Sequence, residues 1–161
     1  MKSKALFPLA PFALVVFIVI VFSCDPQVPP PQQVISYQDA NVLEENFKTT
    51  RAAIINDSLG YEDTREFWFS LDSLKKYIEY VEYEARQQGI EQLGLRVYFA
   101  SYPQNSNYPD PGFATVLFVP TKQVEPSPIR QGFFPMVPIN ENIQTIDAFN
   151  FGHGGKPPTD L

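Results

Sequence analysis

The sequence has little of the residue chemistry on which most enzymes rely. It contains a single histidine, His153, and a single cysteine, Cys24. Zinc ions take most of their ligands from these two residue types, and a disulfide needs two cysteines, so both are excluded within the chain. A serine triad would have to use His153, and no Gly-x-Ser-x-Gly motif accompanies it. We therefore expect no metal, no cofactor and no catalytic residue.

Basic residues are also scarce. The chain has 12 Lys and Arg against 18 Asp and Glu. Two of the basic residues and none of the acidic ones lie in the first 23 positions, so the remainder carries a formal charge of −8. An acidic chain gains nothing from a phosphate backbone or an anionic lipid surface, which argues against a nucleic-acid partner. Aromatic residues make up 14% of the chain, which predicts a folded domain rather than a disordered tail.

The N-terminus is typical of an export signal. Lys2 and Lys4 precede an uncharged apolar run over residues 6–22, which ends at a serine followed by Cys24. A charged start, an apolar middle and a small residue at the exit predict a secretory signal peptide over residues 1–23. A cysteine directly after the small residue resembles the site at which lipoprotein signal peptidase cuts. It predicts a diacylglycerol on the thiol of Cys24.

An uncleaved signal anchor is the alternative, because the apolar run is just long enough to span a bilayer. Lipidation of Cys24 is favoured because a free thiol would be a liability in an oxidising compartment, whereas two or three acyl chains make a stable anchor. Residues 24–34 are rich in proline and predict an extended spacer between the lipid and the domain. Asp25 is the only acidic residue in this spacer, which favours the periplasmic face of the outer membrane over the cell surface.

Proline divides the rest of the chain, residues 35–161, which we expect to form a single α+β domain with a Pro/Gly-rich C-terminal segment. No proline occurs between residues 32 and 102, whereas ten lie from Pro103 to Pro158. Since proline interrupts helices and inner strands, we expect helices in the first part and strands with irregular loops in the second.

Two helices are predicted in the proline-free part. The first starts at Ser36 and ends at Gly60; the second starts at Ser70, a good N-cap, and stops at Gly89, which suits a left-handed turn. Residues 67–69 are all aromatic and are expected to fix the entrance of the second helix on the core. Apolar residues at helical spacing predict the buried stripe of each helix. The stripes are Ala40, Leu43, Phe47 and Ile54 in the first helix, and Leu71, Leu74, Ile78, Val81 and Ala85 in the second.

Strands follow the second helix. Leu95, Val97 and Phe99 occupy alternate positions, the period-two pattern of a half-buried strand. The apolar run over residues 113–119 predicts a central strand, antiparallel to the first, and residues 133–137 predict a short edge strand. The predicted architecture is α+β, with two helices packed on one face of a small, mainly antiparallel sheet.

Aromatic side chains are the candidate binding residues. Tyr98, Tyr102 and Tyr108 lie on or after the first predicted strand, beside a polar loop. There they suit stacking on a sugar ring or contact with a protein, although half-buried strand residues explain them equally well. His153 stands in the glycine-rich tail, which we expect to be mobile, as a turn residue that faces solvent or bonds to backbone.

A cluster of carboxylates supplies an alternative kind of site. Glu62, Asp63 and Glu66 lie in the loop between the two predicted helices. A glycan hydrolase needs two carboxylates that face one cleft, and this loop is where the sequence allows such a pair. The competing interpretations are polar residues at a helix entrance or oxygen ligands for a weakly bound cation.

Several blocks of sequence carry a family likeness. They are Ile54-Ile55-Asn56-Asp57-Ser58-Leu59-Gly60-Tyr61, Phe67-Trp68-Phe69-Ser70, Leu95-Arg96-Val97-Tyr98-Phe99 and Phe151-Gly152-His153-Gly154-Gly155-Lys156-Pro157-Pro158. Over most of the chain after the signal, these blocks resemble a family of uncharacterised lipoproteins of Bacteroidota. The resemblance implies that the protein is anchored to a membrane by lipid and that its C-terminal tail has a role. It implies no activity.

These observations lead to three functional hypotheses. The first is a membrane-anchored, non-enzymatic binding module of the cell envelope, whose partner is an envelope protein or a cell-wall glycan. The second is an envelope glycan hydrolase that uses the paired carboxylates near Glu62 and Glu66. The third is a structural spacer without a specific ligand.

Overall fold

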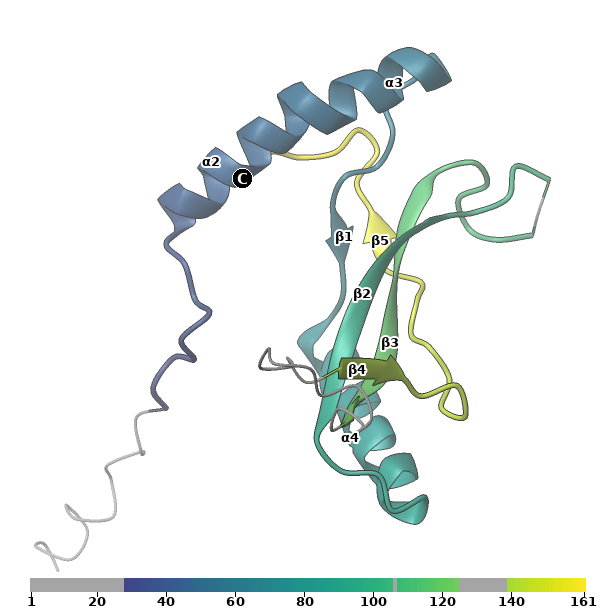
Figure 1. Cartoon of the computed structure of the whole chain (residues 1–161). Coiled ribbons are helices and arrows are strands. Elements are labelled where there is room, and N and C mark those ends of the chain that lie inside the picture. Colours follow the sequence, from purple (N-terminus) through teal and green to yellow (C-terminus); the bar gives the residue numbers. More distant parts are fainter. Residues whose placement is uncertain (1–27, 106, 125–138) are drawn as a thin grey trace, which may run out of the picture. The chain divides into compact units, whose positions relative to one another are not determined.

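The computed structural model describes residues 28–105, 107–124 and 139–161 (Figure 1). The predicted signal peptide, Cys24 and the strand predicted over residues 133–137 therefore lie outside the described residues. The chain divides into two compact units, Met1–Ser36 and Tyr37–Leu161. The elements below all belong to the second unit. Among the residues that the structure describes, no helix is both long enough and apolar enough to cross a membrane.

The first helix is continuous but contains a π-helical turn. It consists of α2 (Tyr37–Phe47), the π-helix η1 (Lys48–Ala52) and α3 (Ala53–Leu59). Gly60 ends it in the left-handed region, at φ 77°, and donates its N–H to the carbonyl of Asn56 at 2.8 Å. The predicted helix from Ser36 to Gly60 is thus confirmed. The π-helix was not predicted, and such turns are frequent at functional sites.

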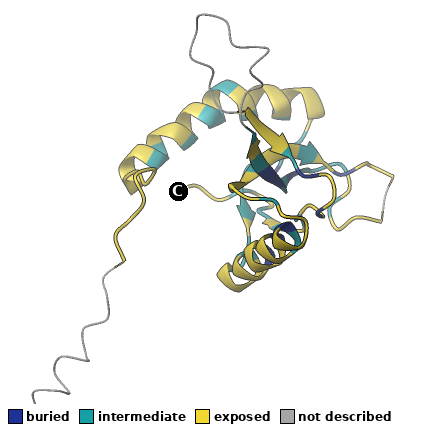
Figure 2. Cartoon of the chain, turned by 60° about the horizontal axis from the view of Figure 1, so that its bottom comes forward, coloured by how far each residue is buried: buried dark blue, intermediate teal, exposed yellow. Residues whose placement is uncertain are grey.

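The predicted buried stripe of this first helix is wrong. Leu43 is 61% exposed and Ile54 is 68% exposed, and no residue of the helix is fully buried. A π-turn contains more residues than an α-turn, so Ile54, which follows η1, is rotated away from the face defined by the residues before it. Leu43 lies before η1, in the regular helix α2, where the half-buried positions include Glu44 and Phe47. Figure 2 shows the helix exposed along most of its length.

The second helix, α4 (Leu71–Gln87), has the predicted ends. The side-chain oxygen of Ser70 accepts the N–H of Ser73 at 3.1 Å, which confirms the N-cap. Gly89 has φ 65°, and the N–H groups of Gly89 and Ile90 bond to the carbonyls of Arg86 and Ala85. This is the Schellman arrangement, in which a left-handed glycine satisfies the last carbonyls of a helix.

The buried face of α4 is rotated from the predicted stripe. Leu71 is 72% exposed and Ile78 is 44% exposed, whereas Tyr77 is only 7% exposed. The ring of Tyr77 stacks on Phe149, with centroids 4.9 Å apart, and its hydroxyl donates to the carbonyl of Asp147 at 2.9 Å. Tyrosine buries as a core residue here because its polar end finds a partner. The core cluster is Tyr77, Val81, Ala85, Ile143 and Ile146.

A three-stranded antiparallel sheet follows α4. It contains β2 (Leu93–Ser101), β3 (Ala114–Val124) and β4 (Ile139–Asn142), in the order β2-β3-β4. The antiparallel pair and the central position of the second strand are confirmed. Together with two helices and a further two-stranded sheet, this makes a small α+β fold.

The apolar face of β2 is more exposed than its sequence pattern predicts. Directly opposed residues of an antiparallel pair share a face, so Val97 lies on the same face as its partner Phe118, as do Leu95 and Phe99. The predicted half-burial of this face is wrong along its length, because Val97 is 55% exposed and Phe99 is 83% exposed. α4 lies near the Leu95 end, and the first helix lies near the Phe99 end.

A second, two-stranded sheet was not predicted. β1 (Phe67–Trp68) pairs antiparallel with β5 (His153–Gly154), so the glycine-rich tail is a strand and not a mobile turn. Just before β5, Phe149 and Phe118 exchange two backbone hydrogen bonds of 2.9 Å, which attach the tail to β3. Phe69 packs edge-on against Phe118 at 5.2 Å, so the prediction that the aromatic run fixes the entrance of α4 holds for Phe69, whereas Trp68 is 66% exposed.

The glycines of the tail allow close packing. A Cβ atom on Gly152 would overlap the ring of Phe69, and a Cβ atom on Gly154 would lie 2.7 Å from Cγ2 of Thr64. Glycine in a strand often marks such a close approach. This explains why a glycine-rich segment is ordered here.

Candidate functional site

Three aromatic rings gather where the loop after β2 meets the tail before β5. Tyr102 stacks on Tyr108 with centroids 5.0 Å apart, and Phe151 stacks on the same two rings at 6.5 and 6.2 Å. We call Tyr102, Tyr108 and Phe151 the aromatic platform. Two of the tyrosines that the sequence suggested for binding therefore lie together, beside the tail.

The members of the platform differ in burial. Tyr102 is 6% exposed, whereas Tyr108 is 47% exposed and Phe151 is 64% exposed. The hydroxyl of Tyr102 donates to Oδ1 of Asn150 at 3.0 Å, and the hydroxyl of Thr115 donates to the same oxygen at 2.9 Å. Tyr102 therefore supports the platform from below, while the other two rings face solvent.

The backbone of Phe151 is strained. Its φ is +65°, in the left-handed region that residues with a Cβ atom rarely adopt. Such a conformation costs about 1–2 kcal/mol per residue. The side chain of Asn150 holds it there by accepting the N–H of Phe151. Strain of this kind persists where the surroundings enforce it, and it is concentrated at functional sites.

Tyr98 lies apart from the platform in a polar cluster across the sheet. Its hydroxyl accepts hydrogen bonds from Arg96 at 3.2 Å and from Asn142 at 2.8 Å. The bond from Arg96, followed by that from Asn142, lowers the pKa of Tyr98. Arg96 also bonds to the carbonyl of Asn140 at 2.7 Å, so the cluster ties β2 to β4 across β3. Its contacts give Tyr98 a structural role.

His153 is exposed on β5, where its register partner is Trp68 on β1. Trp68 is 66% exposed, so the two-stranded sheet of β1 and β5 has two exposed aromatic side chains, Trp68 and His153. Sequence reasoning named His153 but missed Trp68 and Phe151. In the sequence, Trp68 and Phe151 lie close to aromatic residues that pack in the interior, such as Phe69 and Phe149. Only their exposure in the structure distinguishes them from those residues.

The carboxylates of the interhelical loop bind other parts of the protein. Oδ1 of Asp63 accepts the backbone N–H groups of Thr64 at 2.8 Å and of Ala114 at 2.9 Å. Oε1 of Glu66 accepts the hydroxyl of Thr159 at 2.6 Å and its N–H at 2.7 Å, and these bonds lower the pKa of Glu66. Among the residues that the structure describes, no group of three or more His, Cys, Asp or Glu side chains is arranged to hold a metal ion.

An apolar groove of about 820 Å³ lies between the first helix and the ends of β2 and β3. It is open to solvent, and no sequence pattern predicted it. Its apolar lining comes from Phe47, Ala52, Ile55, Phe67, Phe99 and Ala114, with Arg51 and Arg65 among its polar residues. Its volume is typical of the sites that bind small molecules.

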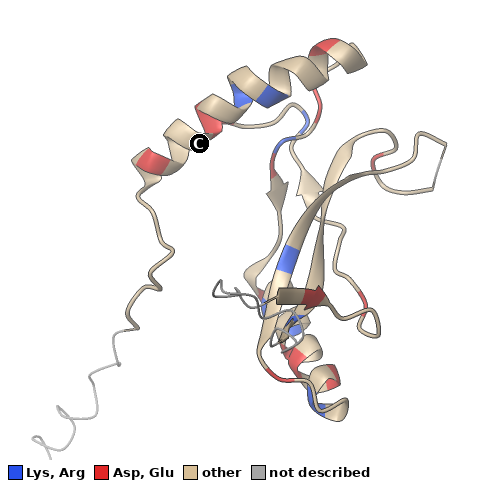
Figure 3. Cartoon of the chain, in the orientation of Figure 1, with Lys and Arg blue, Asp and Glu red and all other residues tan. Residues whose placement is uncertain are grey.

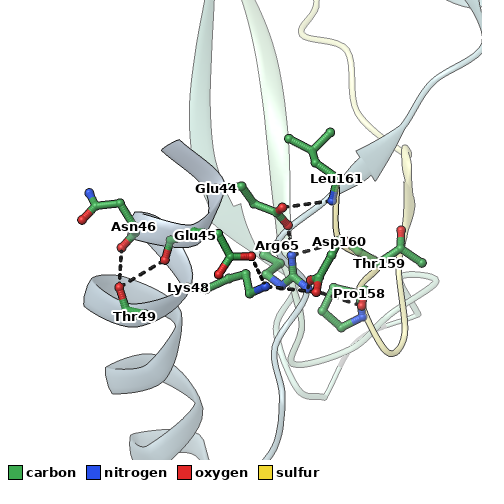
Figure 4. Close-up of polar contacts among 10 residues, drawn as sticks. All are labelled: Glu44, Glu45, Asn46, Lys48, Thr49, Arg65, Pro158, Thr159, Asp160 and Leu161. Atoms are coloured by element: carbon green, nitrogen blue, oxygen red, sulfur yellow. Dashed lines mark hydrogen bonds and ion pairs between the residues drawn. The ribbon is translucent and has the colours of Figure 1, made fainter. Parts of the chain in front are cut away.

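The C-terminus ties the first helix to the segment before β1 (Figure 4). Arg65 forms ion pairs with Glu44 and Asp160, and Lys48 pairs with Asp160 at 3.0 Å. The N–H of Leu161 donates to Oε2 of Glu44 at 3.0 Å. We call these residues the C-terminal clamp. The hydrogen bonds from Lys48 and Arg65 lower the pKa of Asp160. The clamp positions one wall of the groove, because Arg65 lines it.

The comparisons with known proteins add no relative to this picture. No protein-family model, curated protein or solved structure matches the chain.

Proposed function

We propose that the protein is a cell-envelope lipoprotein that acts as a non-enzymatic binding module, with the aromatic platform as its binding surface. The observation that carries the proposal is Phe151, whose ring is 64% exposed on a strained backbone. A residue that only filled space would gain nothing from this conformation. Strain of this kind is explained if the exposed ring of Phe151 contacts a binding partner.

The composition of the platform supports contact with a partner. Large aromatic side chains that keep a polar end in water are enriched at binding surfaces, where they contribute most of the affinity. Tyr108 offers such a ring, and the buried Tyr102 keeps it in place. The partner is an envelope protein or a cell-wall glycan, since a side chain or the apolar face of a sugar ring can lie on such a stack.

The membrane address rests on the N-terminal sequence and on the resemblance to lipoproteins of Bacteroidota. The small residue before Cys24 and the apolar run over residues 6–22 support cleavage and lipidation. We place the protein on the periplasmic face of the outer membrane. Changing Cys24→Ala should abolish acyl labelling and leave the precursor unprocessed. Normal labelling of that variant would contradict the lipid anchor.

A glycan hydrolase is the second candidate, and two observations weigh against it. The general acid of such an enzyme needs a raised pKa, whereas the hydrogen bonds from Thr159 lower that of Glu66. Asp63 is already bonded to two backbone N–H groups. The hydrolase predicts that Glu62→Gln or Glu66→Gln abolishes function, whereas the binding module predicts that both leave capture intact.

The experiment is crosslinking in cells, followed by affinity capture and mass spectrometry. The tag belongs after Gln33, because the C-terminus is part of the clamp. Tyr108→Ala and Phe151→Ala remove the exposed rings, and Tyr83→Ala is the matched control, because this tyrosine of α4 is 54% exposed and lies outside the platform. The same variants are tested for sedimentation with insoluble cell-wall sacculi.

The proposal expects one dominant protein, or binding to sacculi, that the two platform variants lose and the control retains. Loss of a protein partner identifies an interaction module; loss of sacculus binding identifies a glycan-binding one. Capture that is unchanged in all three variants would remove the platform as the binding surface. Release of soluble glycan from sacculi, abolished by Glu66→Gln, would establish the hydrolase instead.

A further inference from the structure

The apolar groove has features that the aromatic platform does not explain. Phe99, at its edge, is 83% exposed, and Ile55, on the opposite wall, is 41% exposed. No other large apolar side chain described in the second unit is as exposed as Phe99. Water is a poor solvent for such surface, so a ligand that covers both walls gains from the hydrophobic effect.

One cation in the groove is not neutralised by the protein. Arg65 is held by Glu44 and Asp160, whereas the hydrogen bond that Arg51 makes among the described residues goes to the carbonyl of Thr50, at 3.3 Å. Within the described residues, Arg51 pairs with no carboxylate. Figure 3 shows basic and acidic positions on the same helices, and the whole chain has 12 basic residues against 18 acidic ones. A free guanidinium beside an apolar surface is suited to a carboxylate or another planar oxyanion.

Three other polar residues of the groove, Asn56, Asp63 and Thr64, bond to other parts of the protein. Oδ1 of Asn56 accepts the N–H of Asp63 at 2.9 Å, and Asp63 accepts two further N–H groups. The hydroxyl of Thr64 lies 3.4 Å from the carbonyl of Gly155, to which it donates. A ligand therefore meets a wall that is mainly apolar, with Arg51 as the charged group that still has free donors.

The π-helix places this charge at the groove. Arg51 lies inside η1, and Phe47 and Ala52, at or next to its two ends, both line the groove. The hydroxyls of Thr49 and Thr50 donate to carbonyls one turn earlier, which satisfies backbone groups that the wider turn leaves exposed. A π-turn therefore coincides with the groove wall, as is common where helices form binding sites.

We propose that this groove binds a single-chain anionic amphiphile of the fatty-acid class. The hydrocarbon chain lies between Phe99 and Ile55, and the carboxylate pairs with the guanidinium of Arg51. The groove volume of about 820 Å³ accommodates such a chain. The site is separate from the aromatic platform and shares no residue with it, so either can be correct without the other.

The test uses the full-length protein in isolated membranes and a fatty acid that carries a photoreactive diazirine and an alkyne. After irradiation, the labelled protein is quantified and digested with trypsin. Label is expected in the peptides over residues 52–65 and 97–122, which contain Ile55 and Phe99. An excess of palmitate should suppress it, whereas cetyl alcohol, which has the same chain and no charge, should suppress it about tenfold less well. A sample kept in the dark controls for acyl groups attached to Cys24.

Variants of Arg51 separate the charge from the fold. Arg51→Gln should lower groove labelling about tenfold, the effect of losing one charge-assisted pair, while Arg51→Lys should retain most of it. Arg86→Gln is the matched control, because Arg86 is an exposed arginine on α4, outside the groove. Ala52→Trp should block the groove and abolish labelling without removing the charge.

Three outcomes would overturn the proposal. They are labelling confined to peptides outside the groove, equal competition by palmitate and cetyl alcohol, and equal labelling of Arg51→Gln and Arg86→Gln. Circular dichroism of each variant shows whether the fold is kept. If Arg51→Gln unfolds, the competition experiment on the unaltered protein still decides.

Discussion

Replacing Arg65 with methionine is the sharpest test of how the domain is held together. The side chain of Arg65 is 8% exposed and lies between Glu44, which is 16% exposed, and Asp160, which is 57% exposed (Figure 4). Methionine keeps an unbranched apolar stem and removes the guanidinium group with its charge. The change leaves the carboxylate of Glu44 in a mostly buried position without its cation.

The expected cost follows from the exposure of the two partners. The exposed pair with Asp160 adds little, because solvent screens the two charges. Loss of one partner of a buried pair costs about 3–5 kcal/mol. Glu44 is only 16% exposed, so its pair with Arg65 resembles a buried pair more than an exposed one. Glu44 also keeps the hydrogen bond from the N–H of Leu161 when Arg65 is replaced. We therefore expect the free energy of unfolding to fall by about 2–3 kcal/mol. For a domain of this size, Tm should fall by about 6–10 °C.

The assay is urea and thermal unfolding followed by circular dichroism, with Glu44→Gln, Arg65→Met and the double variant. Because Glu44→Gln removes the stranded charge, the double variant should be less destabilised than the sum of the two single variants, by at least about 1 kcal/mol. Arg86→Met, at an exposed position, should change stability by less than about 0.5 kcal/mol. Additive effects of Glu44 and Arg65, or a loss no larger than that of Arg86→Met, would refute the reasoning.

Three further predictions concern the core, the tail and the response to pH. Burial raises the pKa of Tyr77 from 10.0 to about 12, so stability is present below pH 10 and should fall as pH rises from 10 to 12. Tyr77→Phe should cost about 1 kcal/mol at pH 7 and remove that alkaline loss in urea titrations; an unchanged alkaline limb would contradict this. Gly152→Ala should cost about 1–3 kcal/mol in the same assay, because its Cβ overlaps the ring of Phe69, and a neutral effect would mean that the tail is not packed there. Hydrogen bonds from Thr159 lower the pKa of Glu66 from its usual 4.5, so its contribution to stability is present above pH 4.5 and is lost as pH falls through the lowered pKa. Glu66→Gln should flatten that acid limb, and equal slopes for both proteins would count against the bond.

Local signals in the sequence predicted the ends of the helices well. The N-cap at Ser70 and the left-handed Gly89 depend on neighbouring residues, so they can be identified from a few positions. The buried faces were predicted less well. The predicted buried stripe of α4 contained aliphatic residues and left out Tyr77. A tyrosine can be buried when a carbonyl accepts its hydroxyl, and here that carbonyl belongs to Asp147, far away in the sequence.

Features built from distant parts of the chain could not be predicted. β1 and β5 have two residues each, too few for a periodic pattern, and they lie more than eighty positions apart. The groove arises where a helix passes the end of a strand, and no local pattern encodes that placement. For the platform, the sequence suggested Tyr102 and Tyr108, but the strained backbone of Phe151 appears only in three dimensions.

The clamp has a consequence for the order in which the molecule matures. Arg65 pairs with Asp160, and β1 pairs with β5, so each contact joins positions more than eighty residues apart. In a chain that crosses a membrane from its N-terminus, as we propose for this one, the segment around Arg65 and β1 emerges well before its partners. These contacts can form only after residues 153–160 have also crossed.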